Sequence, residues 1–496
     1  MLAHSTLDDL VTQIRDYRPS DVLTRVRTLS DAIKKADPPG LVIELPPELR
    51  YGGMEQSLLV AMYLPALIAR LSLLVGHELA PGTLDETRFL RLLRIGCDLY
   101  DPRAYDDPWR YFLRTIFEQA PFQDDVRAMI PRALLMYRDA NGLAASSEHD
   151  IERDFGAAFG MTITNYLTLG FALYAQLLAD PVFFPRVGWH SKVPAFKDLL
   201  TMENRNALLN LVSANATKFR EVNQELAQSQ SKTDRFDFNT LFMYPVVDLG
   251  SGKCTCPIMD LLAMRLYDAP YYELANLHQT NGRANAFRTY FGRVFHEYVG
   301  LLLKDAYSDA SIVPELGPNQ PGPVDWSVHQ GKCSILIECR ASELGLPARY
   351  SGENAEILED LKRIVIAPVN RLRVKQRAIE QAGLLPTEVE HTHLMMVVKE
   401  PLLPVPYMRE MIDAQLSEPT PYHLLAVDDL EQLLALEGTQ GVCKVLAEKE
   451  TDGMADDFRS FFHARRQAYE FRRNPLLDRT FDEYFAELGV PRPALG

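Results

Sequence analysis

Length, composition and charge limit the class of protein before any motif is considered. The chain has 496 residues, 47% of them hydrophobic and 24% charged, which predicts a globular protein of two or three domains and excludes a disordered chain. Its formal net charge of −15 argues against a protein that coats nucleic acid without specificity, because that mode of binding depends on neutralising phosphates. A nuclease with a locally basic channel stays open.

Cysteine content and the first residues of the chain indicate the cellular compartment of the protein. Six cysteines are too few for a disulfide scaffold, and no positively charged segment followed by an apolar one opens the sequence. Both observations predict a protein of the reducing cytoplasm.

The first part of the chain, residues 1–235, is predicted to form an all-helical domain. Leu58–Leu74 is rich in leucine and alanine, and Thr87–Tyr100 alternates apolar and basic residues at helical spacing. Residues 204–232 predict one long polar helix, and the polar segment 229–237 marks the domain boundary. Because no catalytic residues are visible here, we expect this domain to recognise a partner protein or a regulatory signal, or to assemble with a second copy.

One segment of this domain raises the alternative of a transmembrane helix. The run Phe155–Ala179 contains no charged residue. It does contain several threonines together with Asn165 and Gln176, and no basic cluster flanks it. This polar content favours a buried helix, or two short ones, over membrane insertion.

Residues 236–430 predict a mixed α/β domain, and residues 431–496 a helical extension. The expected elements, in chain order, are a strand at 242–248, helices at 257–265 and 287–304, a hairpin at 322–340 and a buried strand at 393–399. In the helix at 287–304, Glu297 interrupts an apolar row, so its carboxylate needs a partner such as a metal-bound water or Arg340. A solvated glutamate at the edge of a core helix is the alternative.

The hairpin has one apolar face and one face that carries chemistry. With a turn at Gln330-Gly331, the apolar residues from Val324 to Cys339 share one face, and the opposite face carries Asp325 and Glu338. These two carboxylates then lie on a diagonal, about 7–8 Å apart along the backbone, from which both can reach one cation. Mg²⁺ is held by one or two carboxylates plus waters, so we expect a site for Mg²⁺ or Mn²⁺.

These residues resemble the motif of the PD-(D/E)XK nuclease superfamily. The matches are Val324-Asp325 on one strand, Glu338-Cys339-Arg340 on the next and Glu297 on the preceding helix. The resemblance covers residues 236–430 and implies a restriction-endonuclease-like mixed sheet flanked by helices. It also implies a metal-dependent nuclease, more specifically an endonuclease with DNA as the favoured substrate, in bacterial restriction or antiphage defence.

The resemblance assigns roles to individual residues. It implies that Glu297, Asp325, Glu338 and Arg340 are catalytic, and that the two carboxylates of the hairpin bind the metal together with the carbonyl of Cys339. One residue departs from the motif, because Arg340 stands where the family has lysine. Arginine stays protonated, so it can position the attacking water or stabilise the pentavalent phosphate but is a poor base.

Three alternatives to a nuclease that uses Arg340 stay open, and the first two follow from the arginine. In the first, another lysine takes over the role of the motif lysine, and Lys332 and Lys362 are the candidates. In the second, the chain is a degenerate nuclease that binds nucleic acid or a partner protein without cleavage. The third alternative is an ordinary exposed hairpin with a surface ion pair between Glu338 and Arg340, which contributes about 0–1 kcal/mol.

Basic and histidine residues after the hairpin complete the candidates. The acid-free run 362–377 is predicted to guide a nucleic-acid backbone, although Arg371 and Arg373 are about 200° apart on an ideal helix. His391 and His393 are expected to share a strand face, in a pair that is more often structural than metal-binding. The predicted nucleic-acid-binding residues are Lys362, Arg363, Arg371, Arg373, Lys375 and Arg377.

Overall fold

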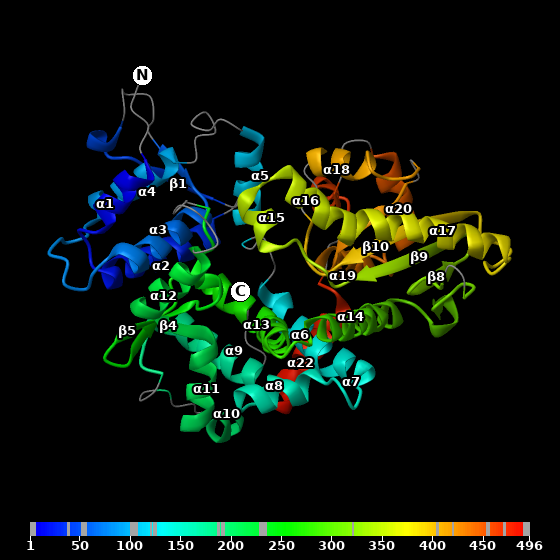
Figure 1. Cartoon of the computed structure of the whole chain (residues 1–496), viewed down its shortest axis with the longest axis horizontal. Helices are drawn as coiled ribbons and strands as arrows, with labels where there is room; N and C mark the ends of the chain where they lie inside the picture. Colours follow the sequence, from blue (N-terminus) through cyan, green and yellow to red (C-terminus); the bar gives the residue numbers. More distant parts are fainter. Residues whose placement is uncertain are drawn as a thin grey trace. The chain divides into compact units, whose positions relative to one another are not determined.

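The chain forms two compact units. One comprises residues 1–130 and 155–271, and the other residues 131–154 and 272–496 (Figure 1). The computed structural model describes residues 6–36, 40–50, 57–99, 108–119, 122, 126–185, 189, 194–227, 236–319, 322–402, 406–418, 421–452, 457–469 and 473–489.

Short strands join the helices of the first unit. A hairpin pairs β1 with β2, and a second sheet has the order β3-β6-β5-β4. The helices are α1 (Leu7–Ile14), α2 (Pro19–Lys35), α3 (Tyr63–Val75), α4 (Glu86–Asp98), α5 (Pro108–Gln119), α9 (Ile163–Ala179), α10 (Pro194–Leu199), α11 (Met202–Val212) and α12 (Ala216–Ala227). The strands are β1 (Leu41–Glu44), β2 (Ser57–Val60), β3 (Val182–Phe183), β4 (Ser213–Asn215), β5 (Val246–Gly250) and β6 (Lys253–Thr255).

The prediction of an all-helical domain before residue 235 is therefore wrong. The start of the predicted helix at 58–74 is instead strand β2, in which Leu58 and Val60 are buried while Leu59 between them is 66% exposed. The predicted long helix at 204–232 is interrupted by β4. There Asn215 accepts a hydrogen bond from the backbone N–H of Lys218 and so caps α12.

The predicted domain boundary also differs from the division into units. Part of the segment 229–237 lies outside the described residues, and the units do not divide there. Strand β5 pairs in parallel with β4, which joins residues 236–271 to the first unit. A separate functional role for residues 1–235 stays a prediction.

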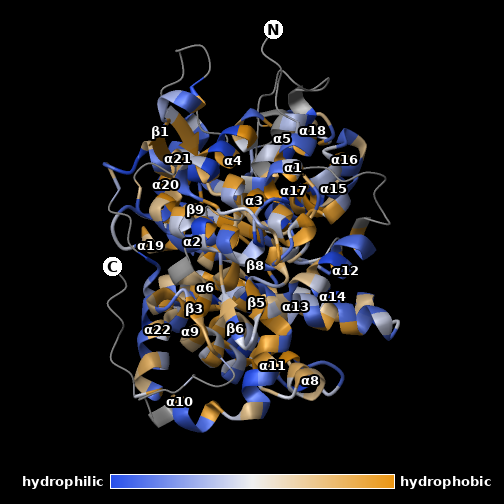
Figure 2. Cartoon of the chain, turned by 90° about the vertical axis from the view of Figure 1, so that its left-hand side faces the viewer, coloured by the Kyte–Doolittle hydropathy of each residue, from blue (hydrophilic) through white to orange (hydrophobic). Residues whose placement is uncertain are grey.

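The charge-free run 155–179 forms two helices, as one of the two alternatives predicted. α8 (Ile151–Phe159) ends before Gly160, whose φ of 75° ends the helix, and Thr162 caps α9 by accepting from the N–H of Asn165. Among the described residues, no helix is both long and apolar enough to cross a membrane. Figure 2 shows hydrophobic and hydrophilic residues mixed along the helices of the chain.

A five-stranded mixed sheet forms the centre of the second unit, in agreement with the predicted α/β class. The order is β11-β10-β9-β8-β7, antiparallel from β7 to β9 and parallel from β9 to β11. The strands are β7 (Ile312–Pro314), β8 (Trp326–Gln330), β9 (Cys333–Arg340), β10 (His391–Val398) and β11 (His423–Ala426).

Helices surround this sheet, and the described part of residues 431–496 is helical as predicted, although the helix at 427–435 crosses the predicted boundary at residue 430. The helices are α7 (Asn141–Ala144), α14 (Ala284–Ala306), α15 (Leu346–Ser351), α16 (Asn354–Leu361), α17 (Ala367–Gln381), α18 (Pro406–Asp413), α19 (Val427–Ala435), α20 (Val442–Thr451), α21 (Phe458–Ala464) and α22 (Pro475–Glu487). α6 (Val126–Leu134), α8 and α13 (Met259–Thr280) contribute residues to both units.

The two faces of the sheet are covered by different helices. Trp326 and the odd-numbered residues of β9 share one face, where the indole occupies the space that a Cβ at Gly300 of α14 would need. The even-numbered residues of β9 point to the other face, where Glu338 contacts Lys375 of α17. Figure 1 shows α14 and α17 on opposite sides of β9.

The hairpin has a different register from the predicted one. Gln330 pairs with Cys333 and Trp326 with Ile337, so the turn is Gly331-Lys332 and not Gln330-Gly331. Gly331 has a φ of 55°, which a glycine adopts without strain. The shift moves each pairing by two residues and therefore leaves the predicted faces unchanged. β9 is buried in the middle of the sheet, which rules out the alternative of an exposed hairpin.

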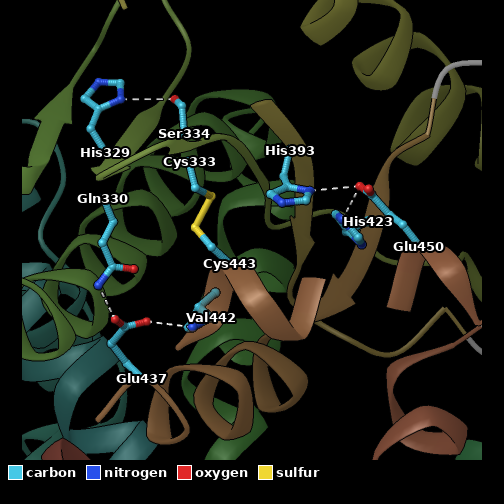
Figure 3. Close-up of a disulfide and its surroundings, with 10 residues drawn as sticks. All are labelled: His329, Gln330, Cys333, Ser334, His393, His423, Glu437, Val442, Cys443 and Glu450. Carbon is cyan, nitrogen blue, oxygen red and sulfur yellow. Dashed lines mark hydrogen bonds and ion pairs between the residues drawn. A yellow bond between two sulfur atoms is a disulfide. The ribbon is translucent and has the colours of Figure 1, made fainter. Parts of the chain in front are cut away.

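One disulfide joins the sheet to a helix, although composition predicted reduced cysteines. Cys333 at the start of β9 is bonded to Cys443 on α20, 110 residues further along the chain (Figure 3). Closing so long a loop restricts the unfolded chain, so reduction is expected to lower the free energy of unfolding by about 2–4 kcal/mol. Urea unfolding with and without reductant measures this, with Cys443→Ser as the variant that should ignore reductant. Equal midpoints for the wild-type protein in both conditions would contradict the prediction.

Candidate active site

Asp325 and Glu338 lie side by side where β8 begins. The pairing of Trp326 with Ile337, continued by one residue, places Asp325 directly opposite Glu338 rather than on the predicted diagonal. Oδ2 of Asp325 accepts a hydrogen bond of 2.7 Å from the N–H of Cys339. The carbonyl of Asp325 accepts from the N–H of Glu315 at 3.1 Å, so both the backbone and the side chain of this aspartate are held in place.

Glu338 is buried between two cations. Its side chain is 2% exposed, Oε1 accepts from Nη2 of Arg340 at 2.7 Å, and Oε2 accepts from Nζ of Lys375 at 2.8 Å. Burial raises the pKa of Glu338, the neighbouring charge of Asp325 raises it further, and Arg340 and Lys375 oppose this shift. Two close carboxylates repel each other, and a divalent cation would relieve that repulsion.

Lys375 is the site residue that the sequence interpretation placed elsewhere. It was predicted to contact nucleic acid, but its side chain is only 10% exposed and its ammonium is bonded to Glu338. The sequence contains a pattern that indicates the burial of Lys375, because Leu372, Lys375 and Ile379 follow the spacing of one buried helix face. A lysine on such a face needs an acidic partner.

Neither candidate for a replacement lysine is at the site. Lys332 is 71% exposed and pairs with Glu390 at 2.6 Å. Lys362 is 49% exposed and lies 3.5 Å from Glu359 in the preceding turn. The lysine beside Glu338 is Lys375, and not either of these two candidates.

Cys339 and Arg340 follow Glu338 directly and end strand β9. Arg340 is 28% exposed and donates from Nη1 to the carbonyl of Cys339 at 3.0 Å as well as from Nη2 to Glu338. Burial raises the pKa of the Cys339 thiol well above its usual range, so the sulfur stays protonated. The carbonyl oxygen of Cys339 is the group of this residue that suits a hard cation, and its role as a metal ligand stays a prediction.

Glu297 is connected to the site through a histidine and does not pair with Arg340. Oε1 of Glu297 lies 3.3 Å from Nδ1 of His296, and Nε2 of His296 lies 3.2 Å from the carbonyl oxygen of Asp325. The side chain of Glu297 is 28% exposed. This environment of Glu297 agrees better with the predicted alternative, a solvated glutamate at the edge of a core helix.

The other predicted nucleic-acid contacts do not form one basic surface. Lys362, Arg363 and Arg377 are exposed and pair with acidic residues, whereas the side chain of Arg373 is buried and donates to the carbonyl of Glu418. Arg371 is exposed. The π-helical turn at 362–366, ahead of α17, changes the rotation of these side chains about the axis relative to an ideal helix.

A second charged cluster follows the ends of β9 and β10. Lys399, which is fully buried, contacts Glu343 and lies 3.5 Å from Glu400, and Arg349 pairs with both acids. Burial raises the pKa of Glu400, but Arg349 and Lys399 outweigh it and hold that pKa at about 2. The cluster therefore carries ionised groups at neutral pH beside the strand that holds Glu338.

This lowered pKa predicts a loss of stability in acid. Because the pKa of Glu400 falls from its ordinary value of 4.5 to about 2 on folding, the stabilisation is present above pH 4.5 and is lost as pH falls toward 2. Glu400→Gln should be less stable than wild type at neutral pH and should lose less stability in that acidic window. Thermal midpoints at a series of pH values measure both effects. Parallel curves for the two proteins would contradict the prediction.

Comparisons with known proteins add little to this geometry. No family model and no curated protein matches the chain. Among solved structures, the chain is similar to the small subunit of the heterodimeric restriction endonuclease R.BspD6I, at 14% identity, with 40% of this chain and 100% of that one covered and a TM-score of 0.21.

Proposed function

We propose that this protein is a metal-dependent nuclease of restriction-endonuclease-like fold that hydrolyses phosphodiester bonds in nucleic acid, with DNA favoured. The observation that carries the proposal is the convergence of Asp325, Glu338 and Lys375, which come from the residue just before β8, from β9 and from α17. Two acids on adjacent strands beside a buried lysine supply the charges that this reaction needs. The motif resemblance of residues 236–430 supports the same chemistry and favours a role in bacterial restriction or antiphage defence.

The donor atoms of the site fit a hard divalent ion such as Mg²⁺ or Mn²⁺. The carboxylates of Asp325 and Glu338 and the carbonyl of Cys339 would hold it, and all three offer oxygen. A bound ion of this kind polarises a phosphate and lowers the pKa of a water. Asp325 lies directly opposite Glu338, and this placement of two acids side by side supports a cation at the site.

The protein's own cations have separate tasks in this proposal. Lys375 is buried and neutralises Glu338, so its ammonium would orient the attacking water from within the site. Arg340 is more exposed and would stabilise the charge that develops on the phosphate. Although Arg340 stands in place of the motif lysine, the site still contains a lysine, because α17 supplies Lys375.

A second function, binding without cleavage, is favoured by one observation. Both oxygens of Glu338 already accept hydrogen bonds, one from Arg340 and the other from Lys375. Arg340 and Lys375 therefore compensate this carboxylate without a metal ion, as a degenerate nuclease would require. Such a protein would bind nucleic acid or a partner protein, and the first 235 residues are proposed to recognise that partner or a second copy of the chain.

Metal binding separates these functions. Calorimetric titration of Mn²⁺ should show a binding event in the wild-type chain that Asp325→Asn and Glu338→Gln each weaken at least about tenfold, since each loses a ligand charge. Glu390→Gln removes an exposed acid that pairs with Lys332 and serves as the control. Equal Mn²⁺ affinity in the wild-type protein and both site variants would remove these residues from the metal site.

A further inference from the structure

A second group of potential ligands lies on the other face of the same sheet. His393 on β10, His423 on β11 and Glu450 on α20 point toward one another (Figure 3). Oε1 of Glu450 lies 2.8 Å from Nδ1 of His393 and 3.0 Å from Nε2 of His423. The three ligand atoms all lie within 4.8 Å of one another.

Strand register and helix spacing bring these residues together. Met395 pairs with His423 in the parallel β10–β11 ladder, so His393, two residues before Met395, shares a face with His423. Glu450 follows Cys443 by seven residues, which is about two helical turns, so both point from one side of α20. The disulfide of Cys443 fixes the start of this helix on the sheet, and Glu450 meets the histidines near its end.

The protonation states suit metal ligation. Burial lowers the pKa of His423, which favours the neutral imidazole. Hydrogen bonds from His423 and His393 lower the pKa of Glu450 to about 2, so this carboxylate is ionised. A neutral imidazole and an ionised carboxylate are the forms that bind a metal ion, and each histidine would carry its proton on the other ring nitrogen once the nitrogen that now faces Glu450 binds the ion.

We propose that His393, His423 and Glu450 form a binding site for a divalent transition metal ion of the zinc class. Imidazole nitrogen suits this class of ion, and tetrahedral ligands at about 2.0–2.2 Å from the metal lie about 3.3–3.6 Å apart, so Glu450 would move away from each histidine by roughly half an ångström. The histidine side chains are 6% and 3% exposed, whereas that of Glu450 is 34% exposed and gives the ion access from solvent. Three protein ligands leave one position for water.

This site is independent of the proposed nuclease site. His393 and Glu338 belong to opposite faces of the sheet, because Met396, and not Met395, pairs with Glu338. The donor sets also differ, since oxygen ligands at Glu338 suit Mg²⁺ and nitrogen ligands at His393 suit zinc. The site would fasten α20 to β10 and β11 whether or not the chain cleaves nucleic acid.

Cobalt and zinc titrations of the full chain, without a histidine tag and in excess Mg²⁺, test the proposal. The wild-type protein should develop the visible absorption of low-coordinate protein-bound Co²⁺, and Zn²⁺ should abolish this absorption and raise the thermal midpoint. Glu450→Gln and His423→Asn should weaken binding at least about 100-fold, a loss at the upper end of that seen when groups supporting metal ligands are removed. Glu450→Gln keeps side-chain shape and, at a partly exposed position, separates lost ligation from lost folding.

Two control variants make the assignment specific. His391→Asn removes an exposed imidazole from the same strand face and should bind as wild type does. His278→Asn disrupts the group of His149, Asp154 and His278, whose ligand atoms also lie within 4.8 Å of one another, and should likewise leave this binding event unchanged. Absence of Co²⁺ absorption in the wild-type protein, or equal affinity in wild type and Glu450→Gln, would overturn the proposal.

Discussion

Lys375→Met should reduce nucleic-acid cleavage about 10²–10³-fold, the loss expected when one pre-organised charged donor is removed from a reacting centre. The ammonium of Lys375 is buried and bonded to Glu338, whereas methionine keeps the apolar stem that packs in α17 but cannot donate. The initial rate of plasmid cleavage in Mg²⁺ measures the effect. Lys332→Met, at an exposed position, is the control and should cleave at the wild-type rate.

Arg340 provides the comparison that ranks the two cations. Because Arg340 is the more exposed of the two, Arg340→Ala should lose less activity than Lys375→Met, and Arg340→Lys should keep most of it. Thermal midpoints of all variants show whether a loss comes from unfolding, since either change removes a partner of buried Glu338. An active Lys375→Met beside an inactive Arg340→Ala would reverse the assignment and return the main role to the arginine.

Arg132→Met should lower the free energy of unfolding of the second unit by about 3–5 kcal/mol, because it leaves a buried carboxylate without its partner. Nε and Nη2 of Arg132 each donate to Glu431 at 2.7 Å, and both side chains are nearly inaccessible. Tyr298 donates to the same carboxylate at 2.6 Å but adds no charge.

Urea unfolding followed by circular dichroism measures this loss. Arg138→Met breaks a more exposed pair with Asp139 and should change stability by no more than about 1 kcal/mol. Combining Arg132→Met with Glu431→Leu should recover part of the loss, because no unpaired charge then stays buried. A change for Arg132→Met as small as that for Arg138→Met would contradict the structural account of this pair.

Much of the second unit was predictable because its elements have strong periodic patterns. The helix containing Glu297, the hairpin and the buried strand after His391 all form close to their predicted ranges. The hairpin turn was misplaced by one residue because Gln330-Gly331 and Gly331-Lys332 both offer a glycine. The even shift kept Asp325 and Glu338 on one face, so the predicted pair of acids survived the error.

What the sequence did not reveal depends on tertiary contacts. Strand β4 interrupts an otherwise helical pattern because β5, about thirty residues away, pairs with it. Lys375 looked like part of a basic run until α17 placed it against Glu338. The partners of His393 come from β11 and α20, separations that no local pattern indicates.

The most direct test of the central claim is a cleavage assay on plasmid DNA, single-stranded DNA and RNA with Mg²⁺, Mn²⁺ or EDTA, comparing the wild-type chain with Glu338→Gln. The nuclease proposal predicts divalent-ion-dependent cleavage of DNA by the wild-type protein, and none with EDTA or with Glu338→Gln, because the variant loses the buried carboxylate that Lys375 and Arg340 surround. Absence of wild-type cleavage on all three substrates with either ion, or cleavage that Glu338→Gln leaves unchanged, would contradict it.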